Sequence, residues 1–217
     1  SIFLYPIITG YISYQNGLWK IKMYEQGINE ISVEDYTNYL EAAHKYNEEL
    51  YEGKVVEDDD EDYLKQLKVP NTDIMGYIYI KKLNIDLPIY HTVDEAVLQV
   101  GIGHLPVSSL PVGGNSTHSV LMGHRGLPTA KLFTNLDRME IGNTFVLKVL
   151  REKYYYKVDE IQVVEPDKVT DEIEIEESKD QVTLITCTPY GINSHRLLIK
   201  GVRTEDQIED DDLQTIL

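Results

Sequence analysis

Apolar residues recur every three or four positions through much of the first fifty residues, which is the spacing of one face of a helix. Within 33–50 this stripe comprises Tyr36, Tyr39, Leu40, Ala43, Tyr46 and Leu50. Ser32, followed three positions later by Asp35, resembles a capping box, and Gly53 suits a helix end. The pattern predicts a helical N-terminal region over residues 1–53.

The pattern changes at Gly76, after which short apolar runs lie between turn-forming residues and predict strands. These runs cover 76–80, 85–90, 118–123, 144–150, 153–164, 181–187 and 195–201. Pro88 indicates an edge strand or a bulge, because proline cannot donate to a ladder. The best helix in this half is expected over 129–139. Many short strands with few helices favour a closed or nearly closed barrel.

An acidic segment separates these two regions. Six consecutive acidic residues run from Glu57 to Asp62, and Pro70 and Asn71 follow. Like charges repel and resist packing, so residues 54–73 are predicted to be a mobile surface segment or a plain disordered linker. A second acidic stretch, 204–212, predicts a loose C-terminal tail after residue 204.

Composition narrows the possible partners. The chain has 217 residues, 42% of them hydrophobic, and a formal net charge of −17. That charge disfavours nucleic acid and anionic membrane surfaces. It suits a basic partner, for instance one presenting lysine, or it only keeps the protein soluble. The opening residues "SIFLYPII" resemble the outer end of a hydrophobic anchor, with an ordinary amphipathic helix start as the alternative.

The single cysteine, Cys187, ends a strong strand pattern. The loop 188–194 is rich in turn formers, and the next strand begins at His195. If these two strands pair, Cys187 lies opposite His195 or Arg196. A neighbouring arginine could favour the thiolate and stabilise the oxyanion of an acyl intermediate. The arrangement suits acyl transfer; the alternative is that Cys187 is a small buried apolar residue.

His124 is the best candidate base among the six histidines, since it follows a strand and lies between two glycines in "GHRG". His118 precedes it by an even number of residues, so a regular strand would put both on one face. This spacing leaves open a zinc site made of His118, His124, Cys187 and His104. A second cysteine and a short ligand pair such as C-x-x-C are both missing from the sequence, which counts against zinc.

Several segments, in order, resemble the class C, pilin-polymerising sortases. The strongest matches are "TLITC" (183–187), the histidine segment 117–145 that contains "LMGHRG", and "TPYGINSHRLLIKGVR" (188–203). Further matches are "MGYIYIKKLNIDLPIYH" (75–91), "GIGHLPVSSLPVGGNS" (101–116) and "YNEELYEG" (46–53). The resemblance implies a mainly β fold, an eight-stranded sortase-type β-barrel over 75–204, with an N-terminal helical extension and a few short helices.

The resemblance also implies roles for three residues. Cys187 would attack the Thr–Gly carbonyl of an LPxTG-like sorting signal and form a thioacyl enzyme. His124 would give a proton to the departing amine and later accept one from the incoming amine. Arg196 would hold the substrate carbonyl and the developing oxyanion. The family requires no metal or cofactor.

The implied partners are pilin subunits that carry the sorting signal and an acceptor lysine, joined by an isopeptide bond. The implied location is the outer face of a Gram-positive cell membrane, with anchor segments missing from this chain. One alternative is a sortase that anchors proteins to the peptidoglycan precursor. An alternative of another class is a non-catalytic β-barrel binding module in which Cys187 is structural.

Class C sortases typically carry a lid with an Asp-Pro-aromatic motif, and this sequence contains no Asp-Pro pair. Glu61 or Asp62 with Tyr63 could form a degenerate version, an acid that meets Arg196 and a ring that covers Cys187. Residues 54–74 are therefore expected to be either a lid or a linker without a plug.

Overall fold

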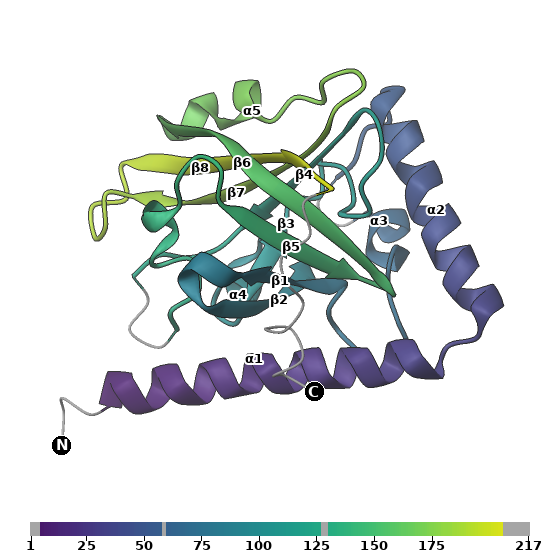
Figure 1. Cartoon of the computed structure of the whole chain (residues 1–217), viewed down its shortest axis with the longest axis horizontal. Coiled ribbons are helices and arrows are strands. Elements are labelled where there is room, and N and C mark those ends of the chain that lie inside the picture. Colours follow the sequence, from purple (N-terminus) through teal and green to yellow (C-terminus); the bar gives the residue numbers. More distant parts are fainter. Residues whose placement is uncertain (1–4, 58–59, 127–129, 206–217) are drawn as a thin grey trace.

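The computed structural model describes residues 5–57, 60–126 and 130–205. Eight strands within these residues form a closed barrel in the order β1-β2-β3-β4-β7-β8-β6-β5 (Figure 1). The strands are β1 (Gly76–Ile80), β2 (Ile85–His91), β3 (Ile102–His104), β4 (Thr117–Met122), β5 (Thr144–Val149), β6 (Glu152–Val164), β7 (Asp180–Thr188) and β8 (His195–Arg203). The barrel confirms the fold class expected from the sequence.

Strand β3 and the setting of Pro88 differ from expectation. Strand β3 has three residues, too few to show an alternating pattern. Strand β2 pairs with β1 on one side and with β3 on the other, so Pro88 is not on an edge strand. Pairing with β3 begins only at Ile89, one residue after Pro88. The missing proline N–H therefore costs no ladder bond on that side.

The helix predicted over 129–139 is wrong. Residues 130–139 form turns and one 3₁₀ turn, η3 (Leu136–Arg138), while residue 129 lies outside the described part. The apolar residues that suggested a helix are buried individually against the barrel: Ala130, Leu132, Phe133, Leu136 and Met139. Their helix-like spacing reflects where this loop touches the core, not a helical backbone.

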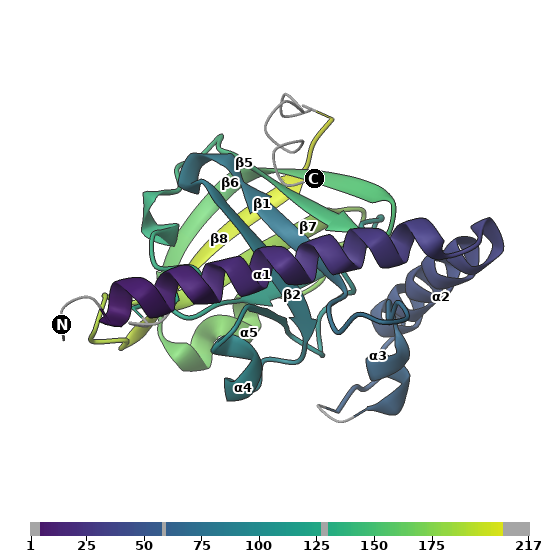
Figure 2. The same ribbon diagram turned by 90° about the horizontal axis from the view of Figure 1, so that it is seen from below.

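Two long helices cover the barrel from outside. Helix α1 (Tyr5–Glu30) runs across β1 and β2, and α2 (Val33–Tyr51) turns away to line another side (Figures 1 and 2). Ser32 caps α2 as predicted, because its Oγ accepts a 2.9 Å bond from the N–H of Asp35. Tyr24 fastens α1 by donating to the Met75 carbonyl at 2.9 Å and accepting from the Leu150 N–H at 2.7 Å. Within the described residues, no helix has both the length and the apolarity needed to cross a membrane.

The acidic segment packs against the molecule, so the prediction of a plain disordered linker is wrong for its described part, whereas the mobility of the segment stays a prediction. A short helix, α3 (Glu61–Lys65), begins at Asp60, whose carboxylate caps it. Apolar residues spaced along the segment are buried: Val56, Tyr63, Leu67 and Val69. Lys54 bonds to Asp62 and Glu49, which offsets part of the repulsion. Burial of these four side chains outweighs the charge pattern. Residues 58–59 of the acidic run, and 206–217 of the tail, lie outside the described residues.

The remaining short helical elements connect the strands. They are η2 (Lys81–Leu83), α4 (Glu95–Leu98), η4 (Pro166–Lys168) and α5 (Val169–Glu172). Helix α4 lies between β2 and β3, and α5 lies between β6 and β7. Leu98 of α4 packs against Gly103 of β3, and Val169 of α5 packs against an apolar cluster formed by Val120, Ile185 and Leu198.

Candidate active site

Cys187 lies on β7, which has β4 on one side and β8 on the other. It pairs with Arg196 across the β7–β8 ladder, as expected from the loop length. Directly paired residues of antiparallel strands project to the same face of a sheet. The thiol is free and half-buried. Cys187 is therefore partly accessible and next to a cation, not sealed in the core.

His124 lies beside Cys187 on the opposite flank. Strands β4 and β7 are parallel and stay in one register, which runs from Thr117 opposite Asp180 to the end of β4. Side-chain bonds continue that register beyond the strand. Thr186 Oγ1 donates to the Gly123 carbonyl at 2.8 Å, and Arg125 Nη1 donates to Thr188 Oγ1 at 3.0 Å. His124 lies between Gly123 and Arg125, and Cys187 lies between their partners on β7. The two residues are therefore neighbours across the pair of strands.

Gly123 allows the chain to leave β4 at this point. A Cβ on Gly123 would lie 2.6 Å from Ile102 Cδ1 and 2.7 Å from a ring carbon of Phe133, closer than any side chain permits. The glycine thus lets the backbone before His124 pass directly beneath two core side chains. This close approach explains the first glycine of "GHRG".

Arg125 ties the histidine segment to its surroundings. Only 7% of its side chain is exposed. Its Nε donates to the Thr134 carbonyl at 3.2 Å, and its Nη2 lies 2.6 Å from an Asp137 oxygen. Together with the bond to Thr188, these contacts join three segments around His124 and Cys187. Sequence reasoning missed this role, since the three contacts come from separate parts of the chain.

Arg196 is held by its own loop. Its Nη1 donates to the carbonyls of Asn193 and His195, both at 3.1 Å. The loop is itself closed by N–H bonds from Ile192 and Asn193 to the Pro189 carbonyl. These hydrogen bonds therefore hold the guanidinium in place next to the loop that joins β7 and β8.

His124 has a carboxylate partner that sequence reasoning missed. Its Nε2 lies 3.2 Å from both carboxylate oxygens of Glu95, which belongs to α4. The pKa of Glu95 is held below its usual range, first by the Gln99 amide that donates to it and then by the charge of His124. No motif in the sequence points to Glu95, because it lies on a four-residue helix 29 positions before the histidine.

Glu61, Asp62 and Tyr63 do not reach Cys187. The Tyr63 ring is fully buried and stacks on His104, with its hydroxyl 3.0 Å from His104 Nδ1. Asp62 pairs with Lys54, and Glu61 lies 3.5 Å from Lys65. Helix α3 and the β7–β8 loop lie on opposite sides of the barrel (Figures 1 and 2). The prediction that these residues cover Cys187 and meet Arg196 is therefore wrong for this structure.

The zinc set considered from the sequence is not assembled. His118 lies 2.9 Å from the Glu174 carbonyl and 2.7 Å from Thr183 Oγ1. His104 lies 2.9 Å from the Ser109 carbonyl on its other side, and burial lowers its pKa to about 4. Across the part of the chain that the structure describes, no three His, Cys, Asp or Glu residues are grouped to hold a metal ion.

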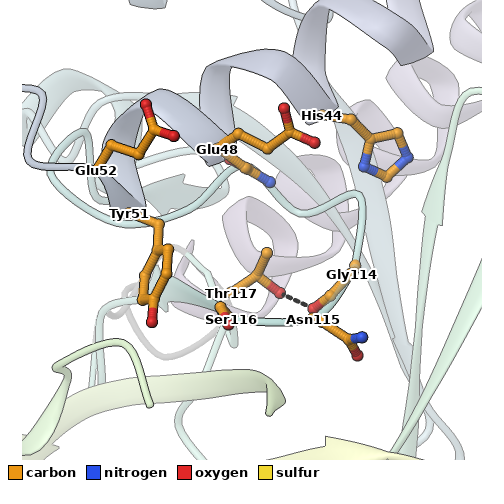
Figure 3. A pocket seen from close by; sticks show the side chains of 10 residues that line it. His44, Glu48, Tyr51, Glu52, Gly114, Asn115, Ser116 and Thr117 are labelled. Atoms are coloured by element: carbon orange, nitrogen blue, oxygen red, sulfur yellow. Dashed lines mark hydrogen bonds between the residues drawn. The ribbon is translucent and has the colours of Figure 1, made fainter. Parts of the chain in front are cut away.

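A cavity of about 370 Å³ lies between α2 and the loop before β4. His44, Glu48 and Tyr51 of α2 line one wall, and residues 113–117 line the other (Figure 3). Thr117 begins β4, whereas His124 follows its far end. This cavity is therefore separate from the site around Cys187.

Comparison with known proteins identifies the family of this chain. The sortase domain model matches residues 78–204. The crystal structure of sortase C1 from Streptococcus agalactiae is 43% identical with a TM-score of 0.81, covering 86% of this chain and 98% of that one. Sortase C from Streptococcus pneumoniae is 38% identical with a TM-score of 0.78, covering 85% and 95%.

A more distant relative is sortase A of Bacillus anthracis, 26% identical over 170 residues, which are 76% of this chain and 79% of that protein. The region matched by the domain model contains Cys187, His124 and Arg196. The closed barrel of the chain and its single cysteine agree with this family match. The resemblance to solved sortase C structures agrees with it as well. The chain belongs to the sortase family and is a cysteine transpeptidase of the class C type.

Proposed function

We propose that this sortase cleaves an LPxTG-like sorting signal between Thr and Gly and transfers the acyl group to a lysine amine of a pilin subunit. The observation that carries the proposal is the convergence of His124, Cys187 and Arg196 at the ends of three adjacent strands, β4, β7 and β8. Each residue then has one role in an acyl transfer.

In the first half-reaction the Cys187 thiolate attacks the threonine carbonyl carbon. The carbonyl oxygen becomes an oxyanion, which Arg196 stabilises with its fixed guanidinium. The C–N bond to glycine then breaks, and the His124 imidazolium gives its proton to the departing amine. The products are a thioacyl enzyme and a free glycine amine.

In the second half-reaction a lysine amine attacks the thioacyl carbon. His124 takes the proton that the amine loses, the C–S bond breaks, and the Cys187 thiolate is restored. The new bond is an isopeptide bond, and no external oxidant or reductant is needed.

Apolar side chains next to the thiol suit the sorting signal. Ile185 lies two residues before Cys187 on β7, so both face the same side of the sheet. Ile185 forms an apolar cluster with Val120 and Leu198, and partly buried residues pack against it: Leu105, Met122, Val164, Val169 and Ile173. The partly buried members would receive the leucine and proline side chains of the signal.

The choice of a pilin lysine rests on the structural relatives and on charge. The Streptococcus pneumoniae enzyme is described in terms of pilin substrate specificity, and another similar structure is that of sortase C1 of GBS Pilus Island 1. The net charge of −17 favours a cationic amine. Such enzymes act on the outer face of a Gram-positive cell membrane, which is the location we propose. Similarity to sortase A supports a second candidate, transfer to the peptidoglycan precursor.

The two candidates differ in the acceptor amine. Incubation with an LPxTG-type peptide plus a lysine-bearing pilin peptide, or plus a peptidoglycan-precursor amine, should yield an isopeptide product with the lysine, detected by mass spectrometry. Cys187→Ala should give neither product. A product with the precursor amine alone would overturn pilin polymerisation and favour anchoring.

A further inference from the structure

Glu95 approaches the proposed acid–base histidine from outside the three strands that carry the site. Both of its carboxylate oxygens lie 3.2 Å from His124 Nε2, so an Nε2–H points between them. A hydrogen bond from a protonated imidazole to a carboxylate is stronger than one between neutral groups. The contact therefore fixes the orientation of the ring and identifies the nitrogen that donates to Glu95.

The fold holds α4 in place for this contact. Leu98, at the end of α4, packs so closely over β3 that a Cβ on Gly103 would lie 3.2 Å from Leu98 Cδ2. Ile102 of the same strand touches Gly123, the residue before His124. Gln99 then donates to Glu95 Oε1 at 2.5 Å and orients the carboxylate. Glu95 is thus placed by packing against β3, the strand that adjoins β4.

We propose that Glu95 is a positioning residue for His124: it accepts the Nε2–H, leaves Nδ1 to exchange protons with the reacting amines, and stabilises the imidazolium before the first proton transfer. This inference rests on the proposed function, because it assigns Glu95 a part in the same acyl transfer. It predicts that the negative charge of Glu95, not only its shape, matters to the enzyme.

Other charges also face His124. Cys187 on β7 favours the imidazolium when it is a thiolate, whereas Arg196 on β8 disfavours it. Arg125 follows His124 in the chain, but Asp137 pairs with it at 2.6 Å and offsets its charge. The Glu95 side chain is 70% exposed, so water and salt screen its contribution. The expected effect is therefore modest and should shrink at high salt.

The direct test follows the protonation of His124 by NMR in the Cys187→Ala background, which removes the coupled thiol. Glu95→Gln keeps the size of the side chain and an acceptor oxygen but removes the charge. We expect the titration midpoint of His124 to fall by about 0.5 pH unit, the scale of an exposed ion pair, and the fall to shrink in high salt. Asp94→Asn is the matched control, because Asp94 accepts from Thr92 and not from His124. It should leave the midpoint unchanged.

A second measurement uses the active enzyme. The alkaline limb of the kcat/KM profile of Glu95→Gln should move to lower pH by a similar amount, with KM for the peptide unchanged. An unchanged His124 midpoint, or a loss of activity without any shift of the profile, would overturn the role of Glu95. Absence of any thioacyl adduct on the wild type would instead overturn the proposed function. The NMR titration would still test whether Glu95 interacts with His124 through its charge.

Discussion

Arg196 lies directly across the ladder from Cys187, and carbonyls of its own loop hold its guanidinium. A planar guanidinium can keep these two bonds and still present further N–H groups to an oxyanion. A lysine ammonium is a point charge on a flexible stem and cannot do both in one geometry. The site therefore requires the shape of arginine in addition to its charge.

We expect Arg196→Lys to lower kcat/KM for sorting-peptide cleavage by about 100-fold, the cost typical of a lost oxyanion donor. Arg203→Lys, at the other end of the same strand, is the control and should stay near the wild-type rate. Turnover close to wild type in Arg196→Lys would remove Arg196 from the mechanism.

The sequence was sufficient to place Cys187 opposite His195 or Arg196, since a short loop between two strands limits which residues meet, and the ladder of the structure selects Arg196. The same reasoning could not find Glu95 or the three contacts of Arg125, because they join segments whose meeting depends on the whole barrel. The roles proposed for His124 and Arg196 rest on the chemistry of the residues and on the family resemblance, and they stay predictions.

At the scale of elements, α3 is anchored by one buried polar group. The Tyr63 hydroxyl contacts His104 and accepts a 3.1 Å bond from the Thr92 N–H. The acidic pattern of 54–73 and the apolar spacing of 129–139 both misled prediction. In each case a few buried side chains, such as Tyr63 and Phe133, determined the backbone path, and only the folded barrel shows where they go.

Tyr63→Phe should lower the free energy of unfolding by about 1–2 kcal/mol, because it leaves buried polar groups without this hydroxyl. Urea denaturation measures the loss, and Tyr51→Phe, at a position that is 46% exposed, is the control. Peptide cleavage should stay within about twofold of wild type, since α3 lies across the barrel from the β7–β8 loop. A several-fold rise in basal cleavage would restore the lid hypothesis.

At the scale of the whole molecule, α1 covers β2 and helps to bury a carboxyl group. Asp86 of β2 is 7% exposed, and its Oδ1 has no hydrogen-bond partner within the described structure. Burial raises the pKa of Asp86 to about 7. An aspartate in the unfolded chain has a pKa of about 4. Between this pH and the raised pKa, the folded state keeps a proton that the unfolded state has lost. Stability from this group is therefore lost as pH rises from about 4 to about 7.

Asp86→Asn should remove that loss. Urea denaturation measures the difference in unfolding free energy between the variant and the wild type at each pH. We expect this difference to be more favourable to the variant at pH 8 than at pH 4, by about 2–4 kcal/mol. His104, whose lowered pKa acts in the opposite direction, is present in both proteins and cancels. Asp94→Asn, at an exposed position, is the control variant and is measured at the same two pH values. Equal stability differences at the two pH values would contradict the burial of an ionisable Asp86.

The most direct test of the central claim is the intact mass of the protein after brief incubation with an LPxTG-type peptide and no added amine. The wild type should gain the mass of the peptide up to threonine, and peptide mapping should place it on Cys187 as a thioester that hydroxylamine removes. Cys187→Ala should gain nothing. A wild-type protein that stays unmodified while its thiol still reacts with an alkylating reagent, or an adduct of equal yield in Cys187→Ala, would contradict acyl transfer through this cysteine.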